Sequence, residues 1–195
     1  MENRKIILAS QSPRRRELLG QYVQELEIMP DNSEEVIDEG MAPEEICMKL
    51  AMQKAENVAA RADKDAIIVA ADTIVFIDGM VLGKPADEEE AAQMLHRLSG
   101  REHHVCTGIA VIDNKKNRKA NDFERTTVHF KPMTDGEIDR YIKTGEPMDK
   151  AGAYGIQDFG ALFIEGVRGD YFNVVGLPLC KLSQILKREF DYTLF

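Results

Sequence analysis

The segment from Ser10 to Arg16 holds residue types that bind anions, directly after a short apolar run. Ser12 is a good helix N-cap, and Pro13 suits the first helical position because its missing N–H needs no partner there. A helix that begins here directs backbone N–H groups and a partial positive charge at the turn. Arginines are unfavourable beside that charge, so three of them in a row indicate a bound anion. Phosphate fits best, because guanidinium groups pair with its oxygens two at a time.

Asp72 is the candidate for proton or metal chemistry. It follows the apolar run 66–71, which is typical of a strand buried on both faces. Ligands of open α/β sheets bind at the carboxyl ends of strands, where a carboxylate can hold Mg²⁺ or take a proton from water. The alternative is that Asp72 only caps or turns the chain. Thr73 beside it can hydrogen-bond a ligand, but threonine is also a common strand residue.

Two lysines could add positive charge to a phosphate site. Lys84 stands between Gly83 and Pro85 in an expected turn, where it can act as a point charge, although a solvated lysine is the commoner case. Lys54 lies among alanines in an expected helix, and a solvated helix face is the favoured interpretation of it.

The segment 149–157 has the composition of a ligand-binding loop. Its small residues let the backbone approach a ligand closely, and Gln157 can both donate and accept hydrogen bonds, as a base-reading side chain must. A loop that binds nothing is the alternative. The acidic loop with Glu34 and Glu35 could supply a metal ligand, or could simply be solvated.

Other familiar sites have no support in the sequence. There is no Walker A motif and no dinucleotide-binding glycine pattern, so kinase, ATPase and dehydrogenase functions are not indicated. His103 and His104 lack partners at metal-ligand spacing. The three cysteines are far apart and form no C-x-x-C pair, which predicts reduced thiols rather than a zinc site or a disulfide framework.

The expected elements alternate between strand and helix. Expected strands cover 6–9, 26–29, 66–77, 80–82, 103–112 and 123–130, and expected helices cover 13–20, 43–62, 91–98, 134–145 and 177–187. We expect Gly20 to end the first helix in a left-handed conformation, Asp78-Gly79 to form a hairpin turn, and 151–175 to consist of loops and short strands. This order predicts an α/β fold with a twisted mixed sheet flanked by helices, in two lobes around a central cleft. No sharp linker is present, so residues 1–195 are expected to be a single domain.

The overall composition limits the function classes. The chain has 195 residues, 44% of them hydrophobic and 30% charged, which is typical of a soluble globular protein. A net charge of −9 argues against nucleic-acid binding, which needs a basic face. No segment approaches the roughly 18 apolar residues of a membrane span, and the N-terminal apolar run is too short for a signal peptide. We therefore expect a cytoplasmic protein with no membrane or nucleic-acid partner.

Six motifs resemble those of the Maf family of nucleoside triphosphate pyrophosphatases. They are Ser10-Gln11-Ser12-Pro13-Arg14-Arg15 with Glu17-Leu18-Leu19, Ala71-Asp72-Thr73, Gly83-Lys84-Pro85, Leu98-Ser99-Gly100-Arg101 with His103, the run from Asp149 to Gln157, and Gly176-Leu177-Pro178. Each motif alone is unspecific, but the ordered set covers nearly the whole chain and is highly specific.

The resemblance implies hydrolysis of a nucleoside triphosphate to the monophosphate and pyrophosphate with a divalent cation such as Mg, Mn or Co. The run 149–157 resembles the branch that acts on dTTP and UTP, and modified pyrimidine triphosphates are a further possibility in a house-cleaning role. The fold implied is that of Maf and inosine triphosphatase-like proteins, often as a homodimer.

The resemblance also implies roles for individual residues. Asp72 would be the proton acceptor that activates water, and Asp72 with Glu35 would hold the metal, Glu34 being the alternative to Glu35. Substrate choice would fall to Arg14, Thr73 and Gln157, and the phosphate site would be lined by Ser10, Ser12, Arg15, Lys54 and Lys84. Arg16 receives no role. Asp158 stands where a glycine is common in the family, which bears on the shape of the loop and on base preference.

A function of another class stays open, namely a non-enzymatic, nucleotide-sensing regulator of cell division and septation. Nucleotide binding without hydrolysis would favour it. Asp72 argues against it, because a protein that only binds an anion gains nothing from a carboxylate beside the phosphates unless a metal is there.

Overall fold

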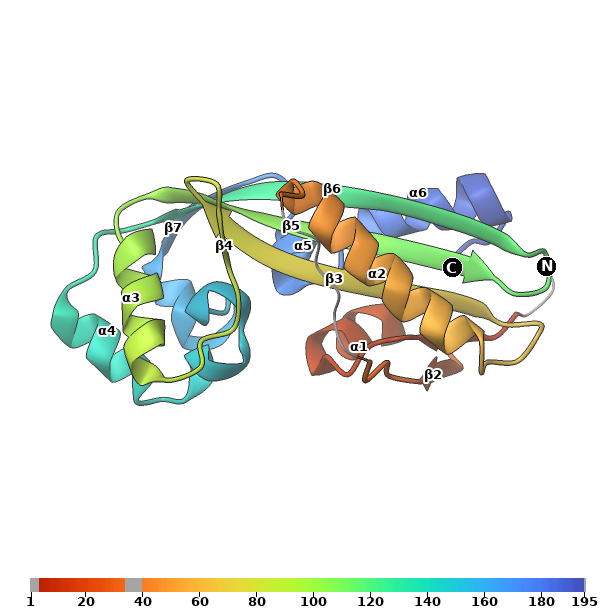
Figure 1. Ribbon diagram of the computed structural model, residues 1–195, viewed down its shortest axis with the longest axis horizontal. Helices are drawn as coiled ribbons and strands as arrows, with labels where there is room; N and C mark the ends of the chain where they lie inside the picture. The colour runs from red at the N-terminus through yellow and green to blue at the C-terminus, as the bar shows by residue number, and fades with distance from the viewer. Residues whose placement is uncertain (1–3, 34–39, 195) are drawn as a thin grey trace. The chain divides into compact units, whose positions relative to one another are not determined.

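A seven-stranded mixed sheet runs through the part of the chain that the computed structural model describes, residues 4–33 and 40–194 (Figure 1). β1 (Ile6–Leu8) pairs in parallel with β2 (Leu26–Ile28) and with β3 (Ile67–Ile77). β3 is followed in the sheet by β5 (Glu102–Asp113), β6 (Arg118–Phe130) and β7 (Ile164–Arg168), and β4 (Met80–Leu82) pairs with β3. The β3–β4 and β6–β7 pairs are antiparallel, so the expected mixed sheet is confirmed.

The chain divides into two compact units that share the long strands. The first unit consists of Met1–Asp72, Thr107–Glu124 and Gly176–Phe195, and the second of Thr73–Cys106 and Arg125–Val175. β3, β5 and β6 each contribute residues to both units, and β3 passes from the first to the second between Asp72 and Thr73. The cleft that we expect from the sequence stays a prediction.

In the first unit, helix α2 (Pro43–Ala59) packs closely on the sheet. Its small side chains meet alternate residues of the strands in one buried cluster: Ile7, Ala9, Ala51, Ala55, Val58, Ala66, Ile68, Ala70, Ala110 and Ile112. At Gly108 of β5 the helix backbone comes so near that a Cβ atom would lie 2.2 Å from the carbonyl oxygen of Cys47. A glycine is therefore required there by the approach of α2. The other helices of this unit are α1 (Pro13–Gly20) and α6 (Leu179–Phe190).

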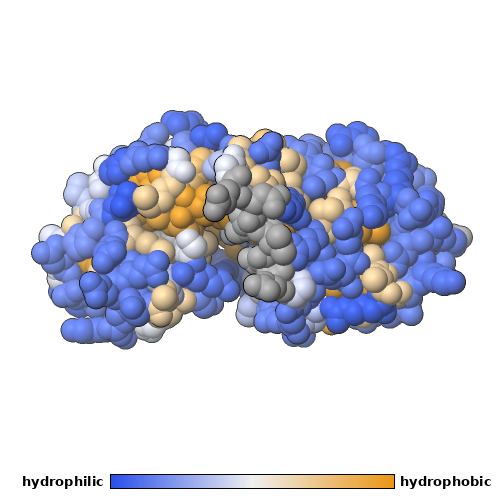
Figure 2. Space-filling model, in the orientation of Figure 1, coloured by the Kyte–Doolittle hydropathy of each residue, from blue (hydrophilic) through white to orange (hydrophobic). Residues whose placement is uncertain are grey.

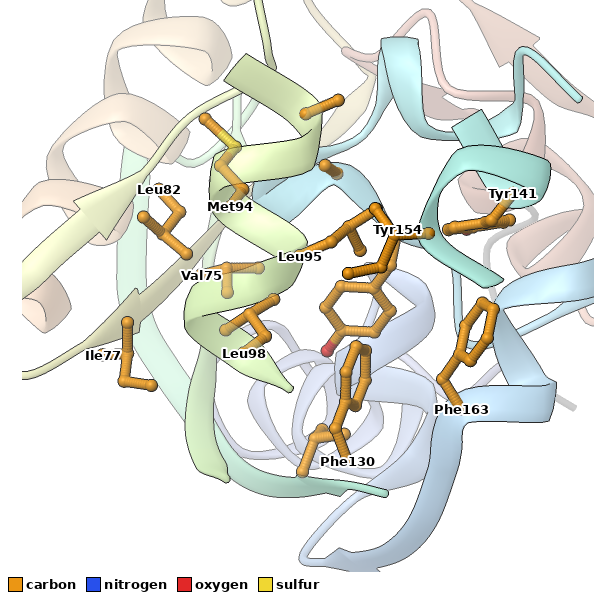
Figure 3. Close-up of a cluster of buried hydrophobic side chains, with 14 of the residues drawn as sticks. Val75, Ile77, Leu82, Met94, Leu95, Leu98, Phe130, Tyr141, Tyr154 and Phe163 are labelled. Atoms are coloured by element: carbon orange, nitrogen blue, oxygen red, sulfur yellow. The ribbon is translucent and has the colours of Figure 1, made fainter. Parts of the chain in front are cut away.

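In the second unit, helices α3 (Glu88–Leu98) and α4 (Asp135–Ile142) enclose a larger apolar cluster. Figure 3 shows Leu95 and Leu98 of α3 beside Val75 of β3, and Tyr154 facing Phe130. The Tyr154 and Phe130 rings meet edge-on with their centroids 4.7 Å apart. Short 3-10 turns η1 (Glu146–Asp149), η2 (Ala151–Ala153) and η3 (Asp158–Phe163) and helix α5 (Tyr171–Val175) complete this unit.

Most expected elements are confirmed, but several differ in conformation or bounds; β6, for example, begins at Arg118 rather than at 123. The first helix ends at Gly20, but not in a left-handed conformation: Gln21 follows with φ −68°, and its N–H donates to the carbonyl of Leu19 in a tight right-handed turn. The segment 151–175 contains only one strand, β7, and otherwise forms 3-10 turns and α5. The hairpin at Asp78-Gly79 is confirmed by positive φ values of 52° and 76°. The last helix begins at Leu179 rather than 177, because Pro178 is its N-cap.

The surface agrees with the charged composition. Figure 2 shows a face that is largely hydrophilic, with apolar residues gathered on the side where β4 lies, and Met80 and Val81 of that strand are exposed. Among the helices of the described residues, none is both long and apolar enough to cross a membrane.

Candidate active site

The turn between β1 and α1 is organised by two serines. The Ser12 hydroxyl caps α1 by accepting a hydrogen bond from the backbone N–H of Arg15 at 3.4 Å, which confirms the expected N-cap. The hydroxyl of Ser10, a residue only 8% exposed, accepts from the N–H of Ser12 and from the guanidinium of Arg15, each at 3.2 Å. The two serines and Arg15 are therefore brought together, as we expect from the sequence.

Arg15 also joins this turn to a distant part of the same unit. Its Nε donates to the carbonyl oxygen of Gly176 at 2.7 Å, which ties the turn to the segment before α6. Arg14, the preceding residue, is half-buried. Arg15 thus fixes the shape of the turn, and this role had no signal in the sequence because Gly176 lies 161 residues away.

Asp72 lies beyond the carboxyl end of β1, on the strand that pairs with it. Leu8 pairs with Val69, and the N–H of Ala9 donates to the carbonyl of Val69 at 2.8 Å. Ser10 therefore lies near the level of Ala71. The strand continues to Ile77, as the expected strand over 66–77 predicts, so Asp72 lies within β3 and not at its carboxyl end. The pairing of β3 with β1 ends at Val69, before Asp72 is reached.

Lys54 of α2 forms an ion pair with Asp72. Its Nζ lies 2.5 Å from Oδ1, and the two side chains are only 18% and 10% exposed. Asp72 has the same parity along β3 as Ile68 and Ala70, which face α2, so strand alternation directs its carboxylate at that helix. The favoured interpretation of Lys54 as a solvated lysine is therefore wrong. Helical periodicity could not reveal this, since it does not say what a helix faces.

A pocket of about 530 Å³ opens beside the serine turn. Its walls are formed by residues of the turn, of α1 and of β2: Ser10, Gln11, Ser12, Pro13, Arg16, Glu17, Gly20, Gln21 and Ile28. Arg16, to which the resemblance gives no role, lines this pocket with both serines. The cationic side chain, the two hydroxyl groups and the helix N-terminus suit a phosphate group, whereas the carboxylate of Glu17 in the same lining opposes an anion.

The second unit holds the other expected site residues. Thr73 follows Asp72 in β3 and so points to the opposite face, which it shares with Val75. Gly152 packs directly against the Val75 side chain, and its N–H donates to the carbonyl of Gly83 at 3.0 Å. The loop that leads to Gln157 and the turn that carries Lys84 are therefore held together on one side of this unit.

Gln157 is half-buried in its loop. Lys84, in the separate turn after β4, is exposed. Asp158 adopts a left-handed conformation with φ 52°. This geometry explains why glycine suits the position, and it shows that aspartate reaches the same conformation in this chain.

Of the expected metal ligands, only Asp72 can be described, because Glu34 and Glu35 lie outside the described residues. Among the residues that are described, no group of three or more His, Cys, Asp or Glu side chains could hold a metal ion. A divalent cation takes about six oxygen ligands, so Asp72 could provide only part of its coordination.

His103 belongs to the core of the second unit. Its Nε2 lies 2.7 Å from the hydroxyl oxygen of Tyr154, and its ring meets the rings of Tyr154 and Phe130 edge-on. Burial, together with the nearby His104, lowers the pKa of His103 to about 3. A neutral imidazole thus holds the tyrosine of the 149–157 loop.

Sequence comparison identifies the family of this chain. The family model described as "Maf-like protein" matches residues 5–189. The chain belongs to the Maf family. A relative from Caldicellulosiruptor saccharolyticus, named dTTP/UTP pyrophosphatase, is 52% identical over 188 residues, which cover 95% of this chain and 94% of the relative.

A second relative of this Maf protein agrees with that match. A protein of the same name from Alkaliphilus oremlandii is 51% identical over 98% of this chain and 99% of the relative. Among solved structures, a nucleoside-triphosphatase named dITP/XTP pyrophosphatase from Mycobacterium abscessus is similar with a TM-score of 0.48 and 16% identity, over 92% of each chain.

Proposed function

We propose that this Maf protein hydrolyses dTTP and UTP to the nucleoside monophosphate and pyrophosphate, with modified pyrimidine triphosphates as further candidate substrates. The names of relatives about half identical over nearly their full length support this substrate choice. The observation that carries the chemistry is the Lys54–Asp72 pair beside the Ser10–Arg15 turn. A carboxylate placed next to a turn with helix N–H groups and arginines suits attack by water on a bound phosphate.

In this proposal the turn binds the polyphosphate. Ser10, Ser12 and the helix N-terminus donate hydrogen bonds to phosphate oxygens, and Arg14 and Arg15 supply positive charge. Lys54 and Lys84 share the charge that develops on the leaving pyrophosphate, which is the main electrostatic task in phosphoryl transfer. Arg15 also preserves the turn through its bond to Gly176.

Asp72 is the proposed general base. Lys54 holds Oδ1, so the carboxylate has a fixed orientation and Oδ2 can accept a proton from water. The water oxygen forms a bond to the α-phosphorus while the bond between that phosphorus and the bridging oxygen breaks. The electron pair leaves with pyrophosphate, and the proton of the water passes to Asp72.

We also propose a divalent cation, Mg, Mn or Co, as the family resemblance implies. Asp72 would be one of its ligands, with Glu35 or Glu34 and phosphate oxygens of the substrate as the others. When bound, the cation would supply positive charge to the polyphosphate.

Gln157, Thr73 and Arg14 are the proposed determinants of substrate choice. The amide of Gln157 can donate one hydrogen bond and accept another, which matches the adjacent carbonyl and N–H of uracil and thymine. On the family resemblance alone, we further propose that the chain acts as one domain, as a homodimer, in the cytoplasm and without a nucleic-acid or membrane partner.

A substrate panel with product identification tests the proposed function. The protein is incubated with Mg²⁺ or Mn²⁺ and dTTP, UTP, CTP, GTP or 7-methyl-GTP, and both pyrophosphate and orthophosphate are measured. We expect pyrophosphate from dTTP and UTP, and a loss of at least about 100-fold in turnover for Asp72→Asn. Asp65→Asn makes the same chemical change at an exposed carboxylate of the same unit and should keep full activity.

Three results would contradict the proposal. Release of orthophosphate instead of pyrophosphate would change the reaction class. Undiminished turnover by Asp72→Asn would remove the general base. Nucleotide binding without hydrolysis would favour the regulatory alternative.

A further inference from the structure

The segment from Gly155 to Gly160 forms a loop that is closed at its neck. A Cβ atom on Gly160 would lie 2.1 Å from the carbonyl oxygen of Gly155, so the two glycine backbones are in direct contact. Gln157 and Asp158 stand in the tip between them, and Asp158 has a positive φ of 52°. The left-handed conformation is less favourable for aspartate than for glycine, so contacts from the surroundings help to stabilise this shape.

Two side chains hold both ends of this loop. The hydroxyl of Tyr141 accepts a hydrogen bond from the N–H of Gly155 at 3.2 Å and donates to Oε1 of Glu146 at 2.8 Å. The same Oε1 accepts from the N–H of Gly160 at 3.1 Å, and Oε2 accepts from the N–H of Phe159 at 3.0 Å. A continuous set of hydrogen bonds thus runs from one end of the loop to the other, through one hydroxyl and one carboxylate.

This pair is itself fixed in the second unit. Tyr141 belongs to α4, is 3% exposed and packs edge-on against Phe163 with ring centroids 5.1 Å apart. Burial raises the pKa of Tyr141, so its hydroxyl stays a donor throughout the physiological range. The backbone carbonyl of Glu146 accepts a hydrogen bond from Lys150 at 2.7 Å. The loop is therefore held by Tyr141 and Glu146, and Tyr141 belongs to the apolar core shown in Figure 3.

We propose that Tyr141 and Glu146 are positioning residues that set pyrimidine selectivity by holding the loop, and with it the Gln157 amide, in the orientation that meets the base. This inference rests on the proposed function. Neither residue needs to touch the substrate: both act through Gln157, and they add to the recognition of the base rather than to the cleavage step. A donor and acceptor pair discriminates bases only while its orientation is fixed, because a mobile amide can turn to suit either pattern.

The test uses Tyr141→Phe, which removes the hydroxyl and keeps the ring that packs on Phe163. We measure kcat and KM for dTTP and for GTP, and inhibition by inorganic tripolyphosphate, which has no base. The ratio of kcat/KM for dTTP to that for GTP should fall about five- to tenfold, since both hydrogen bonds of the Tyr141 hydroxyl are lost. The loss should lie in KM for dTTP, with kcat and tripolyphosphate inhibition unchanged within about twofold.

Tyr171→Phe is the matched control, because it makes the same chemical change at an exposed tyrosine of the same unit. Glu146→Gln is the second variant, which keeps the size of the side chain and weakens its hydrogen bonds to the Phe159 and Gly160 amides. It should lower the dTTP/GTP ratio in the same way, and it decides the question if Tyr141→Phe fails to fold.

A double variant separates positioning from general damage. Once Gln157→Ala has removed the base-reading amide, adding Tyr141→Phe should cost no further selectivity. The inference is overturned if Tyr141→Phe and Glu146→Gln keep the wild-type ratio within twofold, or if Tyr141→Phe lowers the ratio further in the Gln157→Ala background. Absence of pyrophosphate release by the wild-type protein would instead overturn the proposed function, so the two failures are distinguishable.

Discussion

The ion pair between Lys54 and Asp72 should contribute measurably to stability, because both side chains are largely buried. The perturbation is a double-mutant cycle with Lys54→Met, Asp72→Asn and the double variant. Methionine keeps the unbranched stem of lysine and has a similar helix propensity, so α2 itself should be little affected. The cycle then isolates the interaction between the two charged groups.

The expected magnitude follows from the geometry. The Nζ–Oδ1 distance is 2.5 Å, and the side chains are 18% and 10% exposed. Removing one partner of such a pair leaves the other charge poorly solvated, so Lys54→Met should cost about 3 kcal/mol. Asp72→Asn leaves a lysine that can reach solvent along its flexible stem and should cost about 1.5 kcal/mol. The double variant removes both charges and should cost about 2.5 kcal/mol, which gives a coupling energy of about 2 kcal/mol.

The assay is urea unfolding at pH 7.5, followed by far-UV circular dichroism and by tyrosine fluorescence, since the chain has no tryptophan. A matched control cycle uses Glu56 of the same helix and Lys119. Their atoms lie 2.7 Å apart, but both side chains are 48% exposed. That cycle should give a coupling energy of about 0.5 kcal/mol or less. Equal, small coupling energies in the two cycles would refute the reasoning, because burial would then make no difference to the Lys54–Asp72 pair.

Two further predictions concern the fold. Gly108→Ala should destabilise the protein by about 2 to 3 kcal/mol, because its Cβ would lie 2.2 Å from the Cys47 carbonyl oxygen and α2 would have to shift. Gly166→Ala, where nothing lies within 4 Å of the added atom, is the control, and equal unfolding midpoints for the two variants would contradict the prediction. The second prediction is that stability falls as pH decreases below about 6.5, since the lowered pKa of His103, about 3, lets the unfolded chain bind a proton that the folded protein does not. Wild type should lose about 1.4 kcal/mol per pH unit more than His103→Gln in that range, and parallel pH profiles of unfolding would count against it.

Predictions from short sequence patterns were confirmed where the local structure depends on residues that are close together in the chain. The Ser12 cap and the hairpin at Asp78-Gly79 are both present as expected. Each involves residues within three positions of one another, so backbone preference and one or two side-chain hydrogen bonds decide it. The expectation for Gly20 was wrong because the next residue makes its turn in a right-handed conformation, and a glycine permits the left-handed region without requiring it.

The candidate site contains contacts between distant residues that short sequence patterns did not predict. Residue types and order indicated Ser10, Ser12, Arg15 and Asp72, and the structure describes how the first three bond to one another. Nothing in the sequence showed that Lys54 meets Asp72, that Arg15 reaches Gly176 or that Arg16 lines a pocket. These contacts depend on which face of a helix lies against the sheet.

The sequence by itself determined the capped turn between β1 and α1, the family and the buried strand that carries Asp72, because these depend on short-range order and composition. Only the tertiary structure decided that α2 supplies the ionic partner of Asp72, and that Tyr141 and Glu146 hold the Gln157 loop at both ends. The physical reason is that a buried charge and a strained loop need partners supplied by packing. Periodicity and spacing show which face of an element is apolar, but they do not show which residue of another element meets it.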